Sequence, residues 1–208
     1  MSGPDISRPS VPDPAPHHRW SWDPTLYAGS AAFYTHGRVA YPRELGERLA
    51  AALALDGSGR LLDVGCGPGS LAAHQAARVD TDSDEQLPHP RPPRAAITTL
   101  IQQYLGTARR AGRHVLPESA THRGGREEHI YRTAGFLGPH RIELPRRTVQ
   151  RTTEEIRASI YSLSSAAPHL FGGHLDAFDA QLRALLDEAA ADGLFSERMP
   201  EISIDVWR

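Results

Sequence analysis

Apolar residues recur at helical spacing in several stretches of the chain. After Pro42 they follow one another three or four positions apart, and glycines at positions 57 and 59 end the stretch. Residues at this spacing share one face of an α-helix, so the pattern predicts a helix with a buried stripe. The same spacing predicts helices over residues 95–105, 153–163 and 175–191. Thr152 or Thr153 is the expected N-cap of the second of these.

Strand-like patterns are fewer. Residues 60–64, which include the apolar Leu61, Leu62 and Val64, are expected to form a short buried strand that ends in a glycine-rich turn. A helix is expected to begin near Ser70. Further strand-like runs lie at residues 141–144, 148–151 and 202–207. Between Ala72 and Gly106 no apolar, β-branched run reaches strand length. Repeated prolines make residues 87–94 an expected extended loop.

The pattern divides the chain into two parts. Residues 1–22 are rich in proline and too poor in aliphatic side chains to bury a core, which predicts a disordered arm. Residues 23–208 have the length of one domain.

The glycine turn is the strongest candidate for a ligand site. Gly65, Gly67 and Gly69 allow backbone angles that side chains forbid, and they let a ligand approach closely. A helix that begins near Ser70 would point unpaired N–H groups at an anionic or carbonyl-rich ligand end. A dinucleotide fingerprint needs glycine where Ser70 stands, which discourages an oxidoreductase of that type.

The sequence Asp63-x-Gly65-x-Gly67-x-Gly69 resembles the first motif of class I S-adenosylmethionine-dependent methyltransferases. Tyr34-x-x-x-Arg38-x-x-Tyr41-Pro42 and the segments 87–94, 162–172 and 195–207 resemble a bacterial small-molecule branch of that family. The resemblance implies an α/β fold with a Rossmann-like sheet. Because strands are missing after the glycine turn, we expect an incomplete sheet, shortened by an internal deletion, with helices and a C-terminal antiparallel strand pair.

The resemblance also implies a cofactor site for S-adenosyl-L-methionine. Its expected residues are Asp63, Gly65, Cys66, Gly67, Gly69, Arg38 and Asp80. The cofactor's carboxylate suits a helix N-terminus, and its ammonium group suits a carboxylate such as Asp63. Asp80 would hold the ribose, but it follows Gly69 at less than the spacing of about 20 residues that such elements require. The alternative for Asp80 is a solvated acidic loop.

Methyl transfer to a small molecule needs alignment, exclusion of water and, for a hydroxyl or amine acceptor, a general base. The residues expected on the acceptor side are His169, His36 and Tyr34, all in segments that resemble the family. The alternative is that Tyr34 and Tyr41 pack in the domain and Arg38 forms a surface ion pair. A second hypothesis for the whole chain is a non-catalytic remnant or interaction protein that no longer binds cofactor.

Composition excludes several other functions. The chain has no lysine, so a phosphate-binding G-K-[ST] loop and a pyridoxal-phosphate Schiff base are ruled out. Cys66 is the single cysteine, and no H-E-x-x-H motif occurs. His169 and His174 are five positions apart across two glycines and not on one helical face, so no metal site is expected. A net charge of −2 gives no basic surface for nucleic acid. No signal peptide or membrane span is expected either, and we expect a cytoplasmic protein.

Overall fold

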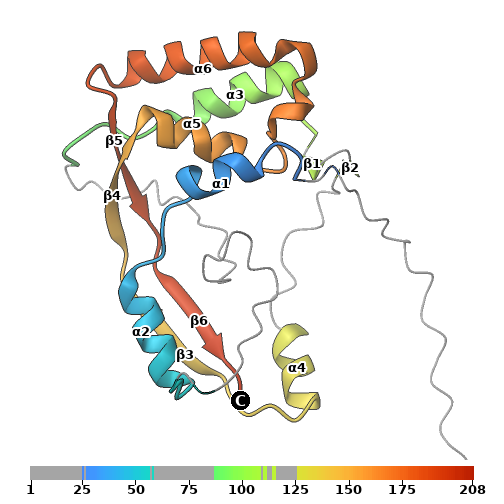
Figure 1. The fold of residues 1–208 in the computed structure, drawn as a ribbon, viewed down its shortest axis with the longest axis vertical. Helices are drawn as coiled ribbons and strands as arrows, with labels where there is room; N and C mark the ends of the chain where they lie inside the picture. Colours follow the sequence, from blue (N-terminus) through green and yellow to red (C-terminus); the bar gives the residue numbers. More distant parts are fainter. Residues whose placement is uncertain are drawn as a thin grey trace, which may run out of the picture.

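The computed structural model describes residues 25, 27–56, 58, 87–108, 110–111, 114–115 and 126–208. These residues form a mixed α/β fold, in which a group of helices packs at one end of a long antiparallel ribbon (Figure 1). The predicted strand at 60–64 and the glycine turn lie outside the described residues. None of the helices in the described ranges combines the length and the apolar character needed to cross a bilayer.

The ribbon consists of two long strands, residues 140–152 and residues 194–206, and each is interrupted once. β3 (His140–Leu144) pairs with β6 (Ile202–Val206), and β4 (Arg147–Thr152) pairs with β5 (Leu194–Met199), all antiparallel. Leu144 faces Ile202 and Arg147 faces Met199, so one register runs through both pairs. Pro145 and Pro200 lie in the gap. Proline has no N–H to donate to a ladder, which explains why the pairing stops and resumes there.

Four helices form the larger core against β4 and β5. They are α1 (Ala31–Gly37), α3 (Arg94–Leu105), α5 (Thr153–Tyr161) and α6 (Leu175–Ala189). Phe178, Phe195 and Tyr161 are almost fully buried between them, and Phe171 stacks on Phe178 at 4.1 Å. Each such side chain contributes about 1.5–3 kcal/mol by leaving water, so this aromatic centre adds substantially to the stability of the larger core.

A smaller core lies at the other end of the ribbon. There α2 (Arg43–Ala52) buries Leu45 against Ile142, Leu144 and Val206. The alternate residues of the same strands are exposed: Arg141, Glu143, Ser203 and Asp205. Arg141 and Asp205 face each other across the strands and form an ion pair at 2.8 Å. One buried and one solvated face is typical of antiparallel sheets, whereas a Rossmann sheet is covered on both faces. The described residues contain no Rossmann sheet.

Two further elements lie apart from these cores. α4 (Arg126–Thr133) is a short exposed helix near the C-terminus, and β1 (Arg110–Ala111) pairs with β2 (His114–Val115) (Figure 1). Between α5 and α6 the chain forms two short 3₁₀ turns, η2 (Pro168–Leu170) and η3 (Gly172–His174).

Most predicted elements are confirmed. Four of the predicted helices correspond to α2, α3, α5 and α6, and the late strand-like runs correspond to β3, β4 and β6. The helix expected near Ser70 lies outside the described residues. Residues 87–93 have no regular structure, as their prolines predicted. The antiparallel pairing of the C-terminal strand is confirmed as well. The sequence patterns missed α1, α4, β1, β2 and β5.

Replacing Thr152 by alanine tests the start of α5. Thr152 Oγ1 accepts a hydrogen bond from the Glu155 backbone N–H at 3.2 Å, and the Glu155 carboxylate accepts one from the Thr152 N–H at 2.8 Å. This reciprocal capping box leads us to expect a loss of about 1 kcal/mol in the free energy of unfolding, measured with urea. Thr99→Ala is the control, because Thr99 is exposed within α3 and its hydroxyl only bonds back to Ala95 O. Equal stability of the two variants would refute the cap.

Candidate functional site

The segment that follows α1 contacts the segment that follows α5. The Arg38 guanidinium lies 5.0 Å from the centre of the Tyr34 ring and donates a hydrogen bond to Ser162 O at 3.3 Å. Partial burial, together with the neighbouring Tyr34, raises the pKa of Tyr41. Two segments expected on the acceptor side are therefore joined, although the sequence separates them widely.

His169 has one ring nitrogen fixed by the backbone. Its Nδ1 lies 2.6 Å from Ala28 O, and because a carbonyl oxygen only accepts, Nδ1 must carry the hydrogen. In the neutral ring Nε2 then has a free lone pair. Nε2 is buried, and no residue in the described part of the chain forms a hydrogen bond with it. This is the tautomer that a general base needs, but an acceptor molecule reaches Nε2 only if the surrounding turn opens.

A small hollow of about 140 Å³ lies between α1, α5, η2 and α6. It is lined by Phe33, Arg157, Tyr161, Pro168, Leu175, Asp176 and Asp179. Sites for nucleoside cofactors and drug-sized ligands usually measure about 300–1,000 Å³. This hollow can therefore hold a group of only a few atoms, and S-adenosylmethionine does not fit in it.

Two of the lining residues, Arg157 and Asp179, belong to a closed ring of ion pairs between α5 and α6. Arg157 pairs with Glu154 and, at 2.5 Å, with Asp179. Arg183 pairs with the same two carboxylates, at 2.6 Å with Glu154 and 3.0 Å with Asp179. The ring is neutral, because it contains two arginines and two carboxylates.

Tyr161 binds to this ring through Asp179 and is held in its protonated form. Its hydroxyl donates to Asp179 at 2.7 Å. Burial and the Asp179 carboxylate raise the pKa of Tyr161. Burial alone would raise the pKa of Asp179, but donors from Arg157, Tyr161 and Arg183 outweigh it and lower that pKa. Tyr161 therefore stays protonated near neutral pH, whereas Asp179 is an ionised, weakly basic carboxylate whose oxygens already accept hydrogen bonds from three donors.

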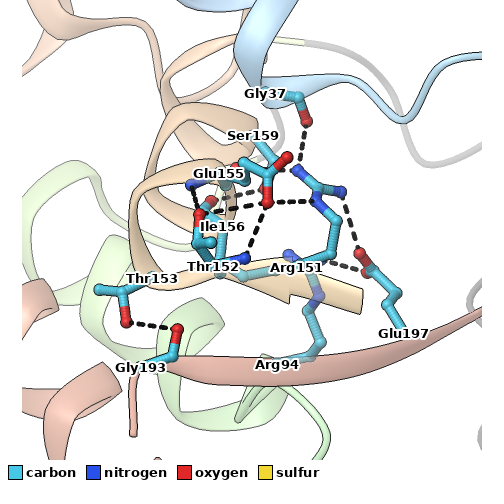
Figure 2. A network of polar contacts seen from close by, with 10 residues as sticks. All are labelled: Gly37, Arg94, Arg151, Thr152, Thr153, Glu155, Ile156, Ser159, Gly193 and Glu197. Carbon is cyan, nitrogen blue, oxygen red and sulfur yellow. Dashed lines mark hydrogen bonds and ion pairs between the residues drawn. The ribbon is translucent and has the colours of Figure 1, made fainter. Parts of the chain in front are cut away.

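A second polar network lies buried beside the ribbon, and it holds the C-terminal end of α1 (Figure 2). Arg151 on β4 donates to Glu197 on β5 at 3.2 Å, and to the carbonyl oxygens of Gly37 and Glu155 at 2.9 Å each. Arg94, at the start of α3, also binds Glu197. Because Gly37 directly precedes Arg38, this network fixes the place where the Tyr34 and Arg38 side chains meet.

The structure brings some of the predicted site residues together and leaves others apart. Tyr34 and Arg38 lie together, and His169 is in η2, next to a residue that lines the hollow. His36 is exposed in the last turn of α1. The expected cofactor residues Asp63, Gly65, Cys66, Gly67, Gly69 and Asp80 lie outside the described residues.

Sequence reasoning missed most residues of the hollow. Phe33, Arg157, Asp176 and Asp179 were not singled out. A signal was present, because Glu154 and Arg157 are three positions apart and Asp179 and Arg183 are four apart, the spacings of helical ion pairs. That spacing did not show that the two pairs close into one ring. In the described ranges no group of three His, Cys, Asp or Glu side chains is placed to hold a metal ion.

Comparison with protein-family models, with curated proteins and with solved structures finds no match to this chain.

Proposed function

We propose that the protein transfers a methyl group from S-adenosylmethionine to a small molecule. The observation that carries this proposal is the sequence Asp63-x-Gly65-x-Gly67-x-Gly69, which resembles the cofactor motif of class I methyltransferases. The contact between Arg38 and Ser162 supports it, because it joins two segments that the same resemblance assigns to the acceptor side.

In this proposal the glycine segment holds the cofactor. The hollow between α1, α5, η2 and α6 is too small for that role. The bound cofactor supplies an activated methyl group, so the chain has to align the acceptor and exclude water. His169 is the proposed base, because the hydrogen bond from its Nδ1 to Ala28 O leaves Nε2 free to accept the acceptor's proton.

A specific observation favours the second hypothesis, a non-catalytic remnant. The paired strands in the described ranges are antiparallel, and the β3–β6 pair exposes the polar side chains of Arg141, Glu143, Ser203 and Asp205. A parallel nucleoside-binding sheet has helices on both faces instead. The ribbon therefore supplies no wall of a Rossmann-type cofactor site.

Calorimetric titration of the full chain with S-adenosylhomocysteine distinguishes the two hypotheses. Methyl transfer predicts binding at about micromolar concentration, or about −8 kcal/mol. Asp63→Asn should weaken this binding roughly tenfold, since it removes a charge-assisted hydrogen bond. Asp187→Asn is the matched control on the exposed side of α6 and should change nothing.

The absence of heat at millimolar ligand, in a sample with a folded circular dichroism spectrum, would refute the methyltransferase proposal. It would leave the remnant as the remaining hypothesis. Binding that Asp63→Asn does not change would refute the assigned cofactor segment.

A further inference from the structure

We propose that the hollow between α1, α5, η2 and α6 binds a small organic cation, with Asp176 as the counter-charge and Phe33 as an aromatic wall. The inference rests on the described residues alone and does not depend on the proposed methyl transfer. The expected ligand of the hollow is a compact ammonium ion that carries a few carbon atoms.

The first argument is the charge that remains in the hollow. Arg157 and Asp179 line it, but both belong to the neutral ring with Glu154 and Arg183. Asp176, one turn before Asp179 on α6, lines the same hollow, and no described residue forms a hydrogen bond or ion pair with it. The side chains of the lining therefore carry one negative charge without an ion-pair partner. Asp176 lies in the first turn of α6, where the positive end of the helix dipole offsets about half of that charge. The remaining negative charge favours a cation and repels an anion.

The second argument is the character of the other walls. The rings of Phe33 and Tyr161 lie 5.0 Å apart at an angle of 46°, and Pro168 and Leu175 complete an apolar lining. Aromatic faces attract cations whose hydration shell is incomplete. The Arg157 guanidinium already lies 5.7 Å from the Tyr161 ring centre. Phe33 and Asp176 are therefore left for an incoming ligand.

The third argument is size. A hollow of about 140 Å³ is less than half the volume of an ordinary drug-sized site, so the ligand has few non-hydrogen atoms and its affinity is bounded by that number. Tetramethylammonium is a suitable probe, since it is compact, permanently charged and cannot donate hydrogen bonds. tert-Butanol is a neutral probe of similar shape, and pivalate carries the opposite charge.

The test is a titration of the ¹⁵N-labelled full chain with these probes, followed by NMR at constant ionic strength. Tetramethylammonium should shift the amide signals of Phe33, Tyr161 and Leu175 and saturate at millimolar concentration. tert-Butanol and pivalate should not saturate these shifts. Equal shifts with the neutral probe would overturn the proposal.

Asp176→Asn isolates the charge. It should raise the dissociation constant for tetramethylammonium about fivefold, the effect of roughly 1 kcal/mol that a favourable, solvent-accessible ion pair provides. Asp187→Asn, on the same helix but outside the hollow, should leave the constant unchanged. An unchanged constant in Asp176→Asn would also overturn the proposal. A negative result with tetramethylammonium does not change the expected result of the S-adenosylhomocysteine titration. Each proposal can therefore be refuted independently of the other.

Discussion

Gly37→Ala should lower the free energy of unfolding by about 3 kcal/mol, because α1 and α5 cross where Gly37 has no side chain. A Cβ at this position would lie 2.6 Å from Ser159 N and closer still to the Ala158 carbonyl group. These are backbone atoms of α5, so they cannot rotate away as a side chain could. The helices would have to separate, which also strains the hydrogen bond from Arg151 to Gly37 O. Urea denaturation followed by circular dichroism measures the change.

Gly46→Ala is the matched control for this substitution. Gly46 lies within α2, and a Cβ there would meet no atom of the described residues within 4 Å. Alanine should therefore stabilise the protein by about 0.5–1 kcal/mol through its higher helix propensity. The two glycine-to-alanine changes are thus expected to have opposite signs. A Gly37→Ala protein as stable as the wild type would show that α1 does not pack this closely on α5.

The crossing at Gly37 also explains why α1 was not predicted. Its residues Ala31–Gly37 are few and include Phe, Tyr, Thr, His and Gly, none of which strongly favours a helix. The helix is held by tertiary contacts instead: Gly37 fits against α5, and Phe33 packs against Tyr161. The longer helices α2, α3, α5 and α6 repeat apolar residues over more turns, so they could be predicted from the sequence pattern alone. α5 also begins with the local capping signal at Thr152.

β5 was missed for a related reason. Its buried residues include Ser196, Glu197 and Arg198, which read as a solvent-exposed stretch in the sequence. Ser196 Oγ accepts a hydrogen bond from the His89 N–H, and Glu197 binds Arg94 and Arg151. Polar side chains can be buried when partners satisfy them, and here the partners come from distant parts of the chain. Local alternation of apolar and polar residues holds no information about such partners.

The candidate site also depends on contacts between residues that are distant in the sequence, so it could be predicted only in part. The ion pairs within α5 and within α6 could be predicted from spacing, but their closure into one ring required the packing of the two helices. The hollow beside that ring depends on α1, which approaches only because of Gly37. Asp176 could be chosen as a ligand-binding residue only after the structure showed that the charges of Arg157 and Asp179 are neutralised within the ring. The motif residues could be chosen from the sequence, whereas the geometry of the hollow could not.

Glu197→Gln should destabilise the protein by about 3 kcal/mol, because it leaves Arg151 charged and buried with only the Glu155 carboxylate, 4.0 Å away, as an ion-pair partner. Arg151 is 5 % exposed and Glu197 is 4 % exposed, so water cannot replace the lost partner. Burial already lowers the pKa of Arg151, and the Glu197 charge counteracts that effect. The amide keeps the size of the side chain, so the expected loss reports charge and not a cavity. Urea denaturation again gives the free energy of unfolding.

Two controls make this prediction specific. Glu143→Gln changes the same chemical group on the exposed face of β3 and should alter stability by no more than about 0.5 kcal/mol. Salt provides the second control, because ions screen exposed pairs such as Arg141 with Asp205 but hardly reach a buried pair. The loss in Glu197→Gln should therefore persist at about 1 M NaCl, where the screening length is roughly 3 Å. A loss that disappears in salt, or that matches the Glu143→Gln value, would show that Arg151 and Glu197 are solvated in the folded protein.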